Sequence, residues 1–128
     1  MKLIVCLDDN NGMMFNKRRQ SRDRILIENA LEYCKGEELY TNEYSAKLFP
    51  ENSVKICEKP EDIENGYFFA ENILPNEERI EEIIVYKWNR VYPADMYFNI
   101  SLENWNLTET VDFEGSSHEK ITREIYVR

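Results

Sequence analysis

Residues 2–7 of the chain, KLIVCL, decide the fold class. The run is apolar at nearly every position, so it lacks the alternation of apolar and polar residues that is typical of a strand with one solvent-exposed face. A strand buried on both faces is typical of a parallel sheet that is covered by other layers. The following residues 8–12, DDNNG, end in Asn-Gly, which is the strongest short turn signal. The opening of the chain therefore predicts an α/β protein.

A helix is expected after the basic, apolar-poor segment 16–24. Ser21 can cap it, and Asp23 is placed in its first turn, where the helix dipole favours a carboxylate. Gly36 is a helix-ending residue. Between these signals, apolar residues recur at helical spacing: Ile27, Ala30, Leu31 and Cys34.

Short strands then alternate with short helices, and the last forty residues have no room for a helix. The expected helices are 43–49 and 61–65, and the expected strands are 39–41, 54–57, 67–70, 80–88, 96–99, 105–113 and 121–128. This order predicts a single domain, 1–128, with a central sheet of roughly eight strands. The sheet is expected to be mostly parallel, with an antiparallel C-terminal strand.

Composition narrows the classes of function. The 128 residues carry a net charge of −9, which argues against nucleic-acid partners because phosphate backbones are repelled. No apolar run approaches the roughly 20 residues of a membrane span, so no membrane partner is expected. Three cysteines without a CxxC pair are most simply reduced thiols in a cytoplasmic protein. The one histidine, His118, excludes most zinc hydrolases and most histidine-based acid–base enzymes.

Two features at the start of the expected helix are candidates for a binding site. Clustered guanidinium groups beside a helix N-terminus can hold an anion, and the basic residues here are Lys17, Arg18, Arg19, Arg22 and Arg24. The alternative is a solvated loop whose cations pair with the acidic remainder of the protein. Asp23 is either a buried acid on a pocket floor or a surface carboxylate that complements the dipole or pairs with Arg19 or Lys17.

A polar loop near the C-terminus, residues 115–120 (GSSHEK), contains Ser, His and Glu together. Neighbours in one loop cannot easily place a hydroxyl and a carboxylate on opposite sides of an imidazole, so the spacing argues against a catalytic triad. A turn whose hydroxyls satisfy backbone groups is the favoured interpretation. The pairs Asp8–Asp9 and Asp95–Asp112 could bind a hard cation, but no recognisable carboxylate motif surrounds them.

The order of segments resembles dihydrofolate reductase over nearly the whole chain. Residues 2–15 are similar to that family's first strand and loop, and 38–49 (ELYTNEYSAKLF) to its next strand and helix start. Residues 80–113 parallel the late strands, and 119–128 (EKITREIYVR) the closing strand. The segment 21–34 (SRDRILIENALEYC) matches the family helix and places Asp23 at its acidic folate-binding position. The resemblance implies a three-layer fold.

The same resemblance implies that the cofactor site is missing. The family carries a Gly-Gly-Gly loop and a helix that hold the cofactor pyrophosphate. Here GYFFAEN (66–72) passes into 73–88 without a glycine, and Glu43 stands where the family has an arginine. An acidic side chain at that position repels the cofactor phosphate. The chain is also about thirty residues shorter than a typical family member, so no cofactor is expected.

A second resemblance is to short bacterial proteins that share the segments YSAKLF (44–49), WNRVYPAD (88–95) and GSSHEKIT (115–122). Such sequences are often labelled ribonuclease Z. That enzyme needs a His-x-His-x-Asp-His cluster and further histidines to hold two zinc ions, and a single histidine cannot supply them.

These observations favour a cofactor-less dihydrofolate reductase-like domain that acts as a small-ligand or protein-binding module rather than an enzyme. The alternatives are a divergent reductase or a ribonuclease Z-type nuclease. The expected ligand-binding residues are Asp23, Arg18, Arg19 and Arg22, with an anionic small molecule or a protein as the partner. On this hypothesis Asp23→Asn abolishes ligand binding and changes stability by less than about 1 kcal/mol.

Overall fold

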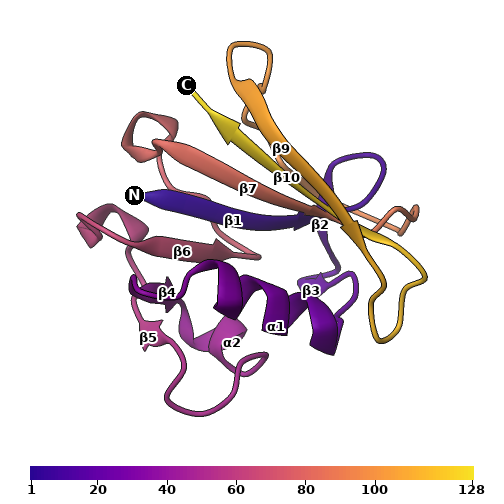
Figure 1. Ribbon diagram of the computed structural model, residues 1–128, viewed down its shortest axis with the longest axis horizontal. Coiled ribbons are helices and arrows are strands. Elements are labelled where there is room, and N and C mark those ends of the chain that lie inside the picture. Colours follow the sequence, from indigo (N-terminus) through magenta and orange to yellow (C-terminus); the bar gives the residue numbers. More distant parts are fainter.

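The computed structural model describes residues 1–128, and a seven-stranded sheet forms its centre (Figure 1). The strand order is β5-β4-β6-β1-β7-β10-β9, and a second sheet has the order β3-β2-β8. The strands are β1 (Lys2–Leu7), β2 (Gly12–Phe15), β3 (Arg18–Arg19), β4 (Leu39–Thr41), β5 (Lys55–Ile56), β6 (Tyr67–Ala70), β7 (Glu82–Lys87), β8 (Met96–Tyr97), β9 (Asn106–Phe113) and β10 (Ile121–Val127). The helices are α1 (Arg24–Tyr33) and α2 (Glu43–Ala46), with 3-10 turns η1 (Pro60–Asp62) and η2 (Glu77–Arg79).

The first strand lies inside the sheet, parallel to both of its neighbours. β1 pairs with β6 on one side and β7 on the other, and β4 and β5 continue the parallel part. β10 runs antiparallel to β7, and β9 antiparallel to β10. The predicted α/β class, with a mostly parallel sheet and an antiparallel C-terminal strand, is confirmed. Leu3 and Val5 face one core cluster and Ile4 the other, which explains the unbroken apolar run.

Different layers cover the two faces of the sheet. Helix α1 packs on one face, where Leu26, Ile27 and Ala30 are buried in the same cluster as Ile4. The other face is covered by the small sheet and by loops, which bury Met13, Met14, Phe98, Ile100 and Trp105. The fold therefore has three layers, and loops and short strands replace a helix in the third.

The basic segment differs from its prediction as a loop. It contains the turn and the second strand of the β2–β3 hairpin, in which Phe15 pairs with Arg18. The two turn residues, Asn16 and Lys17, both have positive φ values of 51° and 62°. A two-residue turn of that conformation matches the twist of a hairpin, but it usually contains glycine. The sequence did not indicate this hairpin because its second turn position is lysine and not glycine.

Two predicted helices are shorter than expected. Helix α2 spans a single turn, Glu43–Ala46, instead of 43–49, and its N-cap Asn42 accepts a hydrogen bond from the Ser45 N–H. The segment 61–65 is represented by the 3-10 turn η1. Only the 3-10 turn η2 stands between β6 and β7, so this crossover lacks an α-helix.

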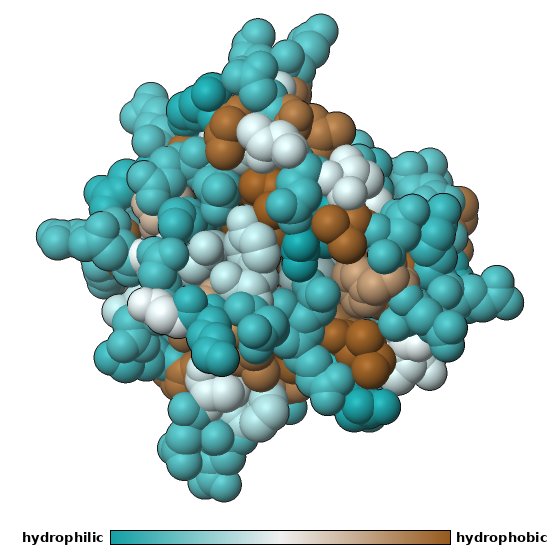
Figure 2. Space-filling model, viewed as in Figure 1, coloured by the Kyte–Doolittle hydropathy of each residue, from teal (hydrophilic) through white to brown (hydrophobic).

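The face shown in Figure 2 is mainly hydrophilic, with scattered apolar patches. All three cysteines are free. No helix has the length and the apolar character that a membrane crossing requires.

Candidate functional site

Asp23 begins helix α1 as its N-cap. Its backbone is extended (φ −153°, ψ 124°), and its carboxylate accepts hydrogen bonds from the N–H groups of Ile25 (2.9 Å) and Leu26 (3.2 Å). The sequence predicted a cap at Ser21 and placed Asp23 in the first turn of the helix, whereas Asp23 is itself the N-cap. The difference matters because an N-cap side chain folds back over the helix end and satisfies its unpaired donors.

The same carboxylate holds the loop that precedes β10. The backbone N–H groups of Ser116 and Ser117 donate to Asp23 at 2.9 Å and 2.8 Å. A Cβ atom at Gly115 would overlap the Asp23 carboxylate, so this close approach requires glycine. The Asp23 side chain is fully buried. It faces the loop and is not an open acid on a pocket floor.

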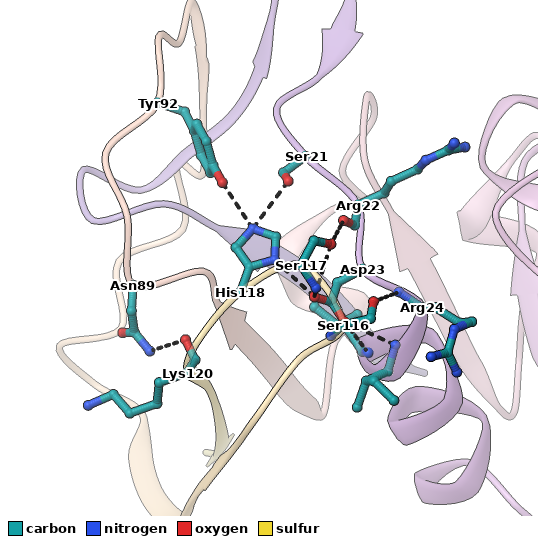
Figure 3. A network of polar contacts seen from close by, with 12 residues as sticks. Ser21, Arg22, Asp23, Arg24, Asn89, Tyr92, Ser116, Ser117, His118 and Lys120 are labelled. Atoms are coloured by element: carbon teal, nitrogen blue, oxygen red, sulfur yellow. Dashed lines mark hydrogen bonds and ion pairs between the residues drawn. The ribbon is translucent and has the colours of Figure 1, made fainter.

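His118 completes the network around Asp23 (Figure 3). Its Nδ1 lies 3.0 Å from Asp23 Oδ2. An ionised carboxylate can only accept hydrogen bonds, so in the neutral imidazole Nδ1 carries the proton and Nε2 presents its lone pair. Nε2 faces two hydroxyl groups, Ser21 Oγ at 3.2 Å and Tyr92 OH at 2.9 Å. We call Ser21, Asp23, Tyr92, Ser116, Ser117 and His118 the Asp23–His118 network.

The imidazole ring is fixed from its face as well as its edges. It stacks on Trp88 with ring centroids 4.6 Å apart and an angle of 27° between the planes. The His118 side chain is 2% exposed and the Trp88 residue is 4% exposed. A buried ring with stacking and hydrogen bonds at both nitrogens has one available orientation.

The network holds Asp23 in its charged form. Burial raises the pKa of the Asp23 carboxyl, but hydrogen bonds from His118 and from the backbone N–H groups of Ser116, Ser117 and Leu26 lower it by more. The net pKa is well below the usual range. The carboxylate is therefore a permanent acceptor that fixes the proton of His118 on Nδ1.

A basic cleft adjoins the network. A cleft of about 570 Å³ lies between the start of α1 and residues 47–50, and it shares Arg22 and Ser117 with a neighbouring hollow of about 470 Å³. Together they form what we call the basic cleft. The hollow is lined by Arg18, Arg19, Ser21, Arg22, Tyr44 and Ser117. The larger part adds Lys47, and it also contains Arg24, which pairs with Glu28 at 3.3 Å.

Arg19 lines this cleft, and its guanidinium group is fixed by contacts within the protein. Its Nε and Nη2 donate to the two oxygens of Glu71 at 2.9 Å and 3.1 Å, and its guanidinium lies over the Tyr44 ring at 4.5 Å. Ser45 Oγ also donates to Glu71, at 2.7 Å. This planar, bidentate pair joins β3 to α2 and to the end of β6.

The structure brings Arg18, Arg19 and Arg22 to one hollow, as their proximity in sequence suggests. Asp23 adjoins the cleft, but both of its carboxylate oxygens are engaged in hydrogen bonds within the network. From the sequence, Ser21 was considered only as a helix cap, and His118 only as a residue of a polar turn. No local signal reveals the actual contacts, because Ser21 and His118 are 97 positions apart.

Asp8 ties the Tyr92 segment to the sheet. Its carboxylate accepts from the N–H groups of Gly12 (2.7 Å), Asn10 (2.9 Å) and Tyr92 (3.0 Å) and from Gln20 Nε2 (3.2 Å). Burial raises its pKa, but these hydrogen bonds lower it by more, so the net pKa falls. These donors occupy Asp8, and no group of three metal-ligating side chains lies together in the protein.

The end of β6 does not fit a dinucleotide cofactor. A pyrophosphate site needs glycines for close backbone approach and a helix N-terminus to meet the charge. β6 ends at Ala70 and is followed by Glu71, whose carboxylate is largely buried against Arg19. The chain then reaches β7 through η2 alone. A largely buried carboxylate and a 3-10 turn thus follow β6, in place of the glycines and the helix N-terminus that such a site needs.

Comparisons with known proteins identify the fold. No family model matches the chain, and no curated protein matches it. Among solved structures, it is similar to dihydrofolate reductase from Enterococcus faecalis complexed with NADP(H) and RAB-propyl. The TM-score is 0.67 at 10% identity, and the match covers 99% of this chain and 95% of that one. The chain therefore has a dihydrofolate reductase-like fold.

Proposed function

We propose that the chain is a binding module that holds a small anionic molecule in the basic cleft. The observation that carries this proposal is the set of cations there that have no carboxylate within ion-pair distance. Arg18, Arg22 and Lys47 line the cleft, and none of them takes part in an ion pair. Unpaired cations gathered in a chain of net charge −9 create a local field that attracts anions.

The chemistry of the cleft favours a carboxylate or a phosphate. Guanidinium groups donate two parallel hydrogen bonds to either anion. The first N–H groups of α1 are already used by Asp23, so recognition falls on the side chains of Arg18, Arg22 and Lys47. A cleft of about 570 Å³ is in the range that small molecules occupy.

The predicted residues then divide into two roles. Arg18 and Arg22 contact the ligand directly. Arg19 supports the wall through Glu71, and Asp23 positions Ser117, which lines the cleft. This division keeps the predicted residue set but changes what two of its members do.

A reductase function has less support. The fold similarity at 10% identity carries no activity with it, and the end of β6 does not fit the cofactor. A ribonuclease Z-type nuclease lacks the cluster of metal ligands that its chemistry needs.

The proposal is tested by calorimetry with a panel of organic phosphates and di- or tricarboxylates. We expect at least one to bind, with an affinity that falls as salt is added. Arg22→Gln should weaken that binding about tenfold or more, because a charge-assisted hydrogen bond is lost. Lys35→Gln removes the same charge beyond the far end of α1 and should leave the affinity unchanged. Binding of no anion, or equal effects of the two variants, contradicts the proposal.

A further inference from the structure

Three side chains of the Asp23–His118 network stand in the order hydroxyl, imidazole, carboxylate. Ser21 Oγ lies 3.2 Å from His118 Nε2, and His118 Nδ1 lies 3.0 Å from Asp23 Oδ2. Because Asp23 fixes the proton on Nδ1, the Nε2 lone pair faces the serine hydroxyl. This is the relationship by which an imidazole removes the proton of a serine that attacks an acyl group.

The hydroxyl of Ser21 is not needed to satisfy the buried ring. Tyr92 OH already lies 2.9 Å from Nε2 and is sufficient as its hydrogen-bond partner. Ser21 is a second hydroxyl at the same nitrogen, and it comes from the segment that lines the basic cleft. A surplus hydroxyl at a fixed base, open to a cleft, is an arrangement that packing alone does not require.

The base is preorganised. Stacking on Trp88 and the bond to Asp23 prevent the ring from turning, and Asp23 is itself held by backbone N–H groups at both ends. Such a site needs little rearrangement when a proton moves. The imidazole is 2% exposed, so water competes little for Nε2.

Hydrogen-bond donors for a developing oxyanion are also at hand. The backbone N–H groups of Ser21 and Arg22 take part in no hydrogen bond within the protein. The N–H of a nucleophilic serine commonly serves this role, and the Arg22 side chain adds a positive charge beside it.

We infer that Ser21 is a nucleophile for the cleavage of acyl esters that carry an anionic group, with His118 as the base and Asp23 as its positioning residue. The anionic group in this inference rests on the proposed function of the basic cleft. Ser21 Oγ forms a bond to the ester carbonyl carbon, and its proton passes to His118 Nε2. The bond to the leaving alkoxide breaks, and His118 returns the proton to it as the alcohol departs. Water, deprotonated by the same Nε2, then attacks the acyl-serine; the bond to Ser21 Oγ breaks, and His118 returns the proton to Oγ, which leaves the carboxylic acid and free Ser21.

The nucleophile is tested with a neutral fluorophosphonate probe, in which serine oxygen displaces fluoride from phosphorus. We expect one adduct per chain, mapped to Ser21 by peptide mass spectrometry. Ser21→Ala should slow labelling by roughly a hundredfold or more, as loss of a base-assisted nucleophile does. Ser101→Ala removes an exposed hydroxyl far along the chain and should label like the wild type. An adduct elsewhere, or equal labelling of Ser21→Ala, overturns the inference.

A second variant measures the base without depending on the probe. Ser21→Cys places a thiol at the Nε2 lone pair, and a neighbouring imidazole favours the thiolate. We expect iodoacetamide to alkylate the new thiol faster than the partly exposed Cys57 of the same chain. An alkylation rate no greater than that of Cys57 at every pH contradicts the role of His118.

The two proposals fail in different ways. p-Nitrophenyl acetate and the p-nitrophenyl monoester of succinic acid differ mainly in one carboxylate. We expect the wild type to favour the anionic ester in kcat/KM, and added salt to remove the preference. Ser21 labelling without this preference would refute the anionic cleft and keep the nucleophile. Anion binding without Ser21 labelling would do the reverse.

Discussion

Nδ1 of His118 lies 3.0 Å from Oδ2 of Asp23 although 95 positions separate the two residues in the chain. The contact joins the N-cap of α1 to the loop before β10. It thereby ties the helix layer to the antiparallel end of the sheet. One carboxylate thus starts a helix, anchors a loop and sets the tautomer of the single histidine. Removing it should disturb all three.

Asp23→Asn should lower the free energy of unfolding by about 3 kcal/mol at neutral pH, because a buried, fully bonded charge is replaced by a group with one acceptor oxygen. This reverses the expectation from sequence, in which the same variant keeps its stability. The measurement is urea denaturation. The exposed Asp9→Asn variant is the control and should change stability by less than about 0.5 kcal/mol.

The effect of Asp23 should depend on pH in a defined direction. Its pKa is lower in the folded protein than the ordinary value near 3.9, so ionisation favours folding. The contribution is complete above that value and is lost as the pH falls through the folded pKa. The stability difference between wild type and Asp23→Asn should therefore be constant near neutrality and shrink below about pH 4. A difference that grows on acidification contradicts this assignment.

Glu71→Ala should destabilise the protein by about 2 kcal/mol, because it leaves Arg19 and Ser45 without their shared acceptor. Solvent reaches the Arg19 side chain, which is 23% exposed, and this moderates the cost. The matched control is Glu38→Ala, which breaks an exposed pair with Lys55 and should cost less than about 0.5 kcal/mol. Equal losses in urea denaturation would show that the Arg19 pair does not join the elements.

Gly115→Ala should cost about 2 kcal/mol or more, because the added methyl group meets the immobile Asp23 carboxylate and Ile121. Gly36→Ala provides the comparison. Its Cβ would meet open space, and only its positive φ of 95° opposes the substitution. We expect thermal denaturation to rank Gly115→Ala as the more destabilising variant, and the opposite order would contradict the close contact at Asp23.

NADPH should show no saturable binding in the micromolar range by calorimetry. Hydride transfer requires the nicotinamide to be held in register, and the glycine loop and helix that hold such cofactors have no counterpart between β6 and β7. Micromolar binding that competes with organic phosphates would place the cofactor in the basic cleft and overturn this prediction.

Much of the sheet is predictable from sequence because its strands have strong local signals. KLIVCL, LYT and the YFFA segment are short apolar runs bounded by turn residues, and β1, β4 and β6 begin and end where the sequence suggests. The start of helix α2 is predictable because Asn42 caps it locally. Its early end is not, because the length of a short helix depends on tertiary packing.

The site is less predictable, because its geometry depends on contacts between distant segments. The arginine cluster is visible in sequence as neighbours, but the pairing of Arg19 with Glu71 depends on how β3 meets β6. Ser21 and Asp23 resemble ordinary helix-capping residues, and His118 resembles a loop residue. Only the folded chain brings Ser21 and Asp23 to the two ring nitrogens of His118.

Tyr92→Phe should accelerate the reaction of Ser21 with the fluorophosphonate probe. In the neutral ring Nε2 has one lone pair, and Tyr92 OH lies closer to it than Ser21 Oγ, at 2.9 Å against 3.2 Å. Removing the phenol hydroxyl leaves the lone pair to Ser21. A neutral hydrogen bond is worth about 1 kcal/mol, so we expect a gain of roughly fivefold in the labelling rate.

Tyr92→Phe should keep its fold, so a changed labelling rate reports on the hydroxyl group and not on unfolding. The Tyr92 segment is held by its backbone N–H, which donates to Asp8 at 3.0 Å, and this bond does not depend on the side chain. The ring also retains its edge contact with His118. Peptide mapping of the adduct must accompany the rate. If labelling in Tyr92→Phe falls to the level of Ser21→Ala, the hydroxyl that His118 activates is that of Tyr92, and Ser21 is not the nucleophile.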